Sequence, residues 1–223
     1  MKQRLEAIFQ ELETKGKKLG RDISLVAVTK FYDIEKIEES INYGVKVIAE
    51  NRAQDFLTKA ELLDGKVKMH FIGHLQRNKV RIVLPYADLI HSVDSLRLIK
   101  EIDKQAKRLD KTQDILLQVN IAKEEQKYGF MKDELEKALE LVEKTTNIRV
   151  VGMMMMAPFA ENPEEVRVFF KEMSELFDLY KETHYNNVHM DILSMGMSGD
   201  YEVAIEEGSN MVRIGSAIYK EEE

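Results

Sequence analysis

The chain lacks cysteine altogether, which excludes disulfide bonds, thiolate catalysis and cysteine-ligated metal sites. It also lacks any apolar run that approaches the ~20 residues of a membrane-spanning helix, and its charged first residues contain no signal core. Basic residues are outnumbered, 33 against 40, for a formal net charge of −7. We therefore expect a cytoplasmic protein that binds neither nucleic acid nor an anionic membrane, with room for a local basic pocket.

Common motifs for metals and nucleotide phosphates are missing as well. The five histidines show no HxH or HExxH spacing, so we expect no metal site. The GxGxxG spacing of dinucleotide-binding loops and the Walker-type phosphate loop are both absent. A phosphate site in this chain therefore has to be built from other elements.

Apolar segments rich in Val, Ile, Leu and Met alternate with helical patterns along the chain. Most of these segments lack period-2 alternation, which is typical of parallel strands that are covered on both faces. Strands are predicted at 24–30, 46–50, 68–73, 89–93, 114–120, 148–156, 189–195 and 211–215. Helices are predicted at 2–19, 33–43, 52–63, 76–84, 95–109, 132–145, 163–183 and 200–207.

This alternation predicts an α/β fold, a single (β/α)8 TIM barrel domain over residues 1–223 with an extra N-terminal helix. A doubly wound open sheet is the alternative. No linker or low-complexity tract divides the chain, apart from a short charged tail. We therefore expect one domain with one site.

Barrel geometry also predicts where that site lies, at the carboxyl ends of the strands, with phosphate often held after the seventh and eighth. Lys30, Asn51 and His74 stand at the ends of the first three predicted strands. The segments 194–198 and 215–216 stand at the ends of the last two. Residues far apart in the sequence are thus expected to meet on one rim.

Lys30 closes an apolar run that begins at Ser24. On position alone, the simplest interpretation is a solvated lysine at the edge of a strand. Apolar walls would instead desolvate the amine and leave it nucleophilic, as imine formation requires. A lysine of this kind, with a distant phosphate cradle, is the arrangement that holds pyridoxal phosphate as a Schiff base.

The segment 194–200 is the candidate phosphate cradle. Its two glycines allow close backbone approach, the start of the following helix offers unpaired N–H groups, and Ser194 or Ser198 can add a hydroxyl. The alternative is an ordinary strand–helix turn in which Ser198 or Asp200 caps the helix. The same composition recurs at 215–216, and the two segments together favour the phosphate site.

Arg213 lies in an otherwise apolar predicted strand, where an unpaired guanidinium is costly. It therefore needs either a carboxylate partner or a ligand at the barrel mouth. Opposite a pyridine nitrogen, the permanent charge of arginine would disfavour protonation of the ring and weaken it as an electron sink.

Three other features have simple structural interpretations. Asn51 can cap the helix that follows it, and His74 can be a hydrogen-bonded structural residue instead of a general acid or base. The four methionines at 153–156 are suited to fill the barrel interior and the strand–helix interface on alternating sides.

Successive motifs along the chain resemble those of one family. They are Val26-Ala-Val-Thr-Lys30, Glu50-Asn-Arg-Ala-Gln54, His70-Phe-Ile-Gly-His-Leu-Gln-Arg-Asn-Lys79, Lys127-Tyr-Gly-Phe130, and the run from Leu193 to Gly208 that continues from Met211 to Tyr219. On these residues the chain resembles the pyridoxal phosphate homeostasis proteins, which are related to the N-terminal barrel of alanine racemase. The resemblance implies a fold-type III pyridoxal phosphate barrel that lacks the C-terminal β-domain.

The resemblance also implies a cofactor and its contacts. Pyridoxal 5′-phosphate would be held by Lys30 as a covalent Schiff base. Ser198 and the segment 215–216 would hold its phosphate, Arg213 would face the pyridine nitrogen, and Asn51 would lie beside the ring. The residues expected around the cofactor are Lys30, Asn51, His74, Ser194, Met195, Gly196, Met197, Ser198, Arg213, Gly215 and Ser216.

Whether the cofactor does chemistry is a separate question, because racemisation by two bases needs a second acid/base group opposite the lysine. In alanine racemase that group is a tyrosine from the partner subunit, beside a β-domain that we expect to be absent here. The first hypothesis is therefore a non-catalytic monomer that stores, buffers or delivers pyridoxal phosphate to apo-enzymes. The second is a weak racemase or other fold-type III enzyme that uses Tyr32, Tyr128 or His74. The third is a Schiff-base aldolase acting on a phosphorylated sugar.

Overall fold

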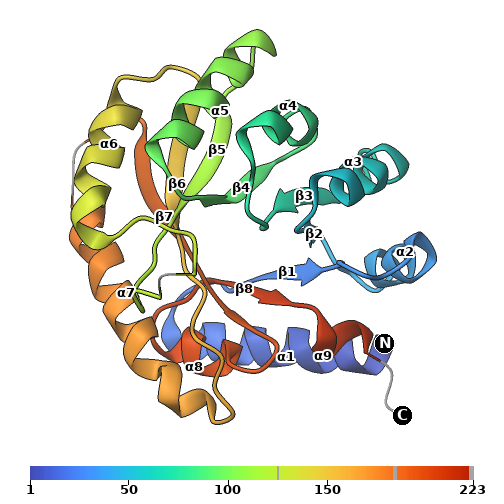
Figure 1. Cartoon of the computed structure of the whole chain (residues 1–223). Coiled ribbons are helices and arrows are strands. Elements are labelled where there is room, and N and C mark those ends of the chain that lie inside the picture. The colour runs from blue at the N-terminus through green and yellow to red at the C-terminus, as the bar shows by residue number, and fades with distance from the viewer. Residues whose placement is uncertain (125, 183–184, 221–223) are drawn as a thin grey trace.

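A computed structural model describes residues 1–124, 126–182 and 185–220. Within these residues, eight parallel strands form a closed barrel in sequence order, and β8 pairs with β1 to complete the ring (Figure 1). The strands are β1 (Ser24–Val28), β2 (Val47–Glu50), β3 (Lys68–Phe71), β4 (Leu89–Val93), β5 (Gln113–Gln118), β6 (Ile148–Met154), β7 (Val188–Met197) and β8 (Met211–Ile214). The barrel prediction is confirmed, and the open-sheet alternative is wrong.

Helices cover the outside of the barrel (Figure 1). They are α1 (Lys2–Leu19), α2 (Ile34–Asn42), α3 (Ala53–Leu62), α4 (Val80–Val83), α5 (Leu96–Arg108), α6 (Leu135–Glu143), α7 (Arg167–Lys181), α8 (Tyr201–Glu206) and α9 (Ser216–Tyr219). Short 3-10 turns, η1 (Arg77–Lys79), η2 (Lys132–Glu134) and η3 (Pro163–Val166), lead into α4, α6 and α7. Position 183, the predicted end of the seventh helix, lies outside the described residues. None of the described helices is long and apolar enough to cross a membrane.

Side-chain caps start three of the helical segments. The side chain of Asp33 accepts a hydrogen bond from the backbone N–H three residues ahead at 2.9 Å, and that of Ser95 does so at 3.4 Å. Asn162 accepts one from two residues ahead at 3.1 Å, with Pro163 at the first helical position. Each cap satisfies an N–H that the helix itself leaves without an acceptor.

The extra N-terminal helix α1 lies alongside α8 and α9, beside the seam where β8 meets β1 (Figure 1). Its buried face carries Leu5, Ile8 and Leu12 at helical spacing. The guanidinium Nε of Arg4 donates to the carbonyl of Ile218 at 3.0 Å and ties the start of α1 to α9. The helix thus closes the outer layer over the first and last strands.

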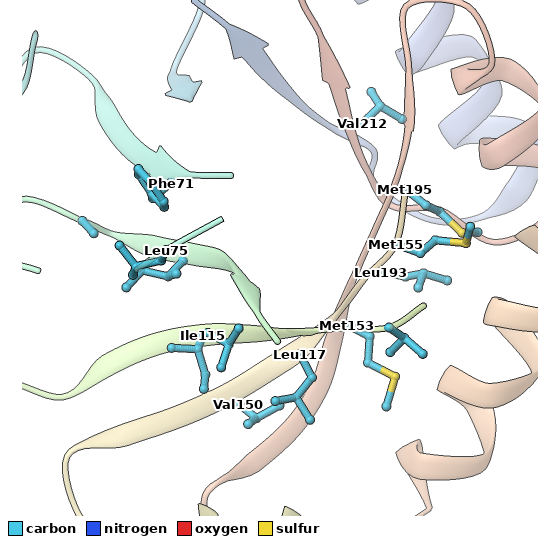
Figure 2. Packing of buried hydrophobic residues seen from close by; sticks show 14 of the residues in the cluster. Phe71, Leu75, Ile115, Leu117, Val150, Met153, Met155, Leu193, Met195 and Val212 are labelled. Atoms are coloured by element: carbon cyan, nitrogen blue, oxygen red, sulfur yellow. The ribbon is translucent and has the colours of Figure 1, made fainter. Parts of the chain in front are cut away.

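The core has two parts, one between the strands and the helices and a smaller one inside the barrel. Met153, Met155 and Met195 point outward toward the surrounding helices (Figure 2), whereas Met154 belongs to the interior cluster. Neighbouring residues of a strand point to opposite faces, so Met153 to Met155 fill both parts, as predicted, whereas Met156 lies beyond β6 and is exposed. The interior cluster consists of Val26, Ala49, Leu89, Leu116, Val151, Met154 and Met211.

Candidate functional site

A cleft of about 690 Å³ opens at the carboxyl ends of the strands, where the barrel geometry predicts the site. Most of the predicted site residues line it, and they come from both ends of the chain. They are Lys30, Asn51, His74, Met197, Ser198, Arg213, Gly215 and Ser216. The closed barrel brings them together because β1 is hydrogen-bonded to both β2 and β8.

Lys30 lies two residues beyond the end of β1, in a turn that directs it into the cleft wall. The turn is closed by the N–H of Tyr32, which donates to the carbonyl of Thr29 at 3.1 Å, and Phe31 adopts a left-handed φ of 76°. The Lys30 side chain is exposed, with Nζ 5.7 Å from the centre of the Phe31 ring. The exposed side chain fits the simpler of the two interpretations, a solvated lysine at the edge of a strand, because the strand ends before the lysine.

A buried polar cluster beneath Lys30 holds the backbone that carries it. The ammonium of Lys59 donates to the Thr29 carbonyl at 2.9 Å and to Oε1 of Glu50 at 2.6 Å. The Thr29 hydroxyl donates to the same carboxylate oxygen at 2.6 Å. Sequence reasoning missed this cluster, although an acidic residue at the end of the apolar strand β2 was a visible signal.

Hydroxyl and amide groups gather at the ends of β7 and β8. The oxygen of Ser198 accepts hydrogen bonds from the backbone N–H of Gly215 at 3.2 Å and of Ala217 at 3.3 Å. Because the oxygen already accepts two donors, the Ser198 O–H proton is available to a ligand in the cleft. Ser216 is exposed at the cleft wall, and among the described residues no acceptor engages its backbone N–H.

Asp200 engages the backbone N–H of Met197, one of the residues expected around the cofactor. Its carboxylate accepts from the N–H of Met197 at 2.6 Å, at the entry to the short helix α8. Burial raises the pKa of Asp200, and this hydrogen bond and the charge of Arg213 oppose that shift. The N–H of Met197 is therefore not available to an anion in the cleft.

Arg213 forms part of the cleft floor and is 4% exposed. Its guanidinium donates to the Ser194 hydroxyl at 2.6 Å and to the carbonyl of Met155 at 2.8 Å. Both acceptors are neutral, and no ion pair engages Arg213 in the part of the chain that the structure describes. Desolvation lowers its pKa to about 10, so the group keeps its charge at neutral pH.

His74 reaches the cleft from the loop after β3. Its Nδ1 lies 2.9 Å from the carboxylate of Asp94, and its ring stacks on Tyr128 with centroids 3.6 Å apart and planes at 12°. Both rings line the cleft. A carboxylate that orients an imidazole is the arrangement of a general base, but the same contacts also serve to hold the wall of the cleft.

Three predicted site residues do not line the cleft. Ser194 is fully buried below the floor, where it contacts Arg213. Met195 points outward into the helix-facing core (Figure 2). Gly196 has a φ of 93° and packs so closely on α8 that an added Cβ would come within 2.8 Å of the Cα of Tyr201. Alternation along β7, with a register shift after Ser194, separates these residues from the cleft.

The structure adds residues that the sequence did not single out. Gln118, Ile72 and Met156 line the cleft together with Tyr128. Within the described residues, no three His, Asp or Glu side chains lie close enough together to hold a metal ion.

Comparison with known proteins gives matches over nearly the whole chain. A family model described as alanine racemase, N-terminal domain, matches residues 4–223. A pyridoxal phosphate homeostasis protein of Aquifex aeolicus is 40% identical over 223 residues, which are 98% of this chain and 97% of that protein. These matches confirm the family that the motifs indicated.

Solved structures agree with this assignment. PipY of Synechococcus elongatus PCC7942, in a structure with PLP bound, superposes with a TM-score of 0.86 at 27% identity, covering 98% of this chain and 99% of PipY. An alanine racemase of Clostridium difficile 630 shares the fold, with a TM-score of 0.68 at 18% identity. That match covers 90% of this chain and 53% of the racemase.

Proposed function

The chain belongs to the alanine racemase N-terminal domain family, and we propose that it binds pyridoxal 5′-phosphate in the cleft at the carboxyl ends of its strands. Its role is pyridoxal phosphate homeostasis, by storing, buffering or delivering the cofactor. This is the role that the name of the Aquifex aeolicus relative describes, and the PipY structure was solved with PLP bound.

The observation that carries the proposal is the set of groups that meet in one cleft. Lys30 supplies an amine, Ser198 and the segment 215–216 supply hydroxyl and amide donors, and Arg213 supplies a fixed cation. When bound, pyridoxal phosphate supplies an aldehyde that forms a Schiff base with a lysine. We assign Lys30 to that aldehyde, the serines to the phosphate and Arg213 to the ring nitrogen, with Asn51 beside the ring.

We favour storage or delivery over turnover. The Tyr32 ring, two residues after Lys30, packs on the Tyr219 ring with centroids 4.6 Å apart, and the Tyr219 hydroxyl lies 2.8 Å from the hydroxyl of Ser40. The exposed position of Lys30 leaves its amine accessible to an incoming aldehyde or amine. We extend the proposal to a cytoplasmic monomer that passes the cofactor to apo-enzymes by transient contact.

A second candidate, weak amino-acid racemisation, is favoured by the pair formed by His74 and Asp94. The carboxylate orients the imidazole at the cleft wall, so His74 could accept a proton from a bound amino acid. The Tyr128 ring that covers it is half exposed, which leaves a path for a substrate.

Borohydride trapping followed by peptide mass spectrometry tests the binding proposal. Wild-type protein incubated with pyridoxal phosphate should carry the reduced adduct on the peptide that contains Lys30, and the yellow colour should disappear on reduction. Lys30→Ala should abolish the adduct. Lys46→Ala, an exposed lysine at the opposite end of β2, should leave it unchanged. An adduct of equal yield in Lys30→Ala would refute the assignment.

Two further measurements separate the carrier from the enzyme. NMR should show deuterium exchange at Cα of alanine no faster with loaded protein than with free pyridoxal phosphate. Faster exchange that is lost in His74→Phe would establish the racemase alternative. Transfer to an apo-enzyme should outpace the dissociation of cofactor into buffer, and equal rates would limit the protein to passive storage.

A further inference from the structure

The upper half of the barrel interior is polar, in contrast to the apolar layer below it. His70 is the register partner of Ala49, and Ser194 is the partner of Met154, so both share the inward face of these interior residues. His91 lies two residues after Leu89 on the same face of β4. Barrel interiors are usually filled by branched apolar side chains, so buried polar groups here need an explanation.

These side chains form one continuous hydrogen-bonded chain that begins at the cleft. Arg213 contacts the Ser194 hydroxyl at 2.6 Å, Ser194 contacts Nδ1 of His91 at 3.0 Å, and Nε2 of His91 lies 3.0 Å from Nδ1 of His70. Arg213 is 4% exposed, Ser194 and His91 are 0%, and His70 is 5%. Only the first member reaches the cleft.

The hydrogen-bonded chain runs from Arg213 to His70, because a guanidinium only donates and, among the described residues, Nδ1 of His91 is the one acceptor within reach of the Ser194 O–H. Ser194 therefore accepts from Arg213 and donates its own O–H to Nδ1 of His91. That leaves the ring proton of His91 on Nε2, which donates to Nδ1 of His70. Both histidines are then neutral with the proton on Nε2, in agreement with the desolvation that lowers both their pKa values.

We propose that His91 is a positioning residue which, through Ser194, fixes the Arg213 guanidinium in the cleft floor so that it meets the bound cofactor at a set place and in its charged form. This inference rests on the proposed function. Without the Ser194 contact, the two hydrogen bonds of Arg213 fall to one, to the carbonyl of Met155, and the guanidinium can rotate about it. The histidines never touch the ligand and act through Arg213 alone.

The direction of the hydrogen-bonded chain is tested first in the cofactor-free protein. Nitrogen-15 NMR of the histidine rings between pH 6 and 8 should show His70 and His91 neutral and protonated on Nε2. His189, an exposed histidine of β7, supplies the reference signals of a solvent-exposed ring. A proton on Nδ1 of His91 would reverse the chain and overturn the proposal.

The effect on cofactor binding is tested with two variants. His91→Leu breaks the hydrogen-bonded chain, and His91→Gln preserves it. A glutamine amide can accept from Ser194 and donate to His70. His91→Leu should raise the Kd for pyridoxal phosphate about tenfold and shift the absorption maximum of the bound cofactor. This is the effect expected if the charge-assisted contact of Arg213 with the cofactor is lost. His91→Gln should stay within about twofold of wild type, as should the surface control His189→Gln.

Ser194→Ala keeps the test decisive if His91→Leu does not fold, since it removes the same link with a smaller change of volume. Its Kd and absorption spectrum should match those expected for His91→Leu. Folded His91→Leu or Ser194→Ala protein with wild-type Kd and spectrum would overturn the positioning role and leave the proposed function intact. A wild-type protein that fails to bind pyridoxal phosphate would overturn both, even with the NMR result as expected.

Discussion

Ser198 connects the two halves of the proposed phosphate site, because its hydroxyl on the β7 side accepts two N–H groups from the β8–α9 segment. Ser198→Ala removes that acceptor and a donor to the ligand. We expect the Kd for pyridoxal phosphate to rise by about tenfold or more, while trapping on Lys30 still reaches completion at saturating cofactor. Fluorescence titration measures the change. Ser24→Ala, at the opposite end of the barrel, is the matched control.

The ion pair of Glu50 and Lys59 supports the Lys30 turn and is almost fully buried. Lys59→Met leaves the Glu50 carboxylate buried without its cation and should cost about 3–5 kcal/mol of unfolding free energy. The double variant Glu50→Leu with Lys59→Met removes both charges and should recover most of that loss. Urea unfolding of the two variants gives the comparison. A single variant as stable as wild type would show that the pair does not hold the turn.

At the scale of elements, β7 depends on Gly196, whose φ of 93° suits glycine and whose missing Cβ admits α8. Gly196→Ala should destabilise the protein by about 2–4 kcal/mol, through the left-handed backbone and the clash with Tyr201. Gly199→Ala is the control, because no atom lies within 4 Å of its added Cβ. Thermal unfolding of both variants should separate them clearly, and equal melting temperatures would contradict this account.

The sequence was most informative about which helices and strands form and in what order. The number and order of strands followed from apolar segments, and Asp33 and Ser95 start their helices as capping chemistry requires. The ends of strands were less predictable, since the apolar run that includes Lys30 continues past the last ladder hydrogen bond of β1. The helix expected at 76–84 is a short 3-10 turn followed by a single turn of α-helix.

Which side a residue faces was the hardest feature of the site to predict. The motif that contains Ser194, Met195 and Gly196 was expected in the cleft as a unit, but alternation along β7 sends these three residues to different surroundings. The link between Arg213 and His91 was likewise invisible, because β4 and β8 are far apart in the sequence and only the closed barrel joins them.

At the scale of the whole molecule, the buried histidines make stability depend on acidity. Desolvation lowers the pKa of His70 to about 3 from 6.5, and that of His91 is lowered as well. Below pH 6.5 the unfolded chain therefore binds protons that the folded chain does not, and unfolding free energy falls as the pH drops toward 3. His70 should contribute about 1.4 kcal/mol per pH unit over that range, and His91 should change the stability in the same direction.

Urea denaturation between pH 7 and 4.5 measures this effect. His70→Leu should lose stability less steeply with acid than wild type, because one titrating group is removed. The exposed His189→Gln should follow the wild-type curve. Parallel curves for His70→Leu and wild type would show that His70 is protonated in the folded protein.

The pairing of β1 with β8 has a consequence for the synthesis and folding of the protein. The residue proposed to anchor the cofactor is made on the ribosome well before Arg213 and the segment 215–216, which lie in β8 and directly after it. Because β8 closes the ring against β1, no partial chain can assemble the cleft. Contacts of such long sequence separation also form slowly. The cleft is therefore a sign that the barrel has closed: a chain that stops before β8 carries the lysine but cannot hold the cofactor around it.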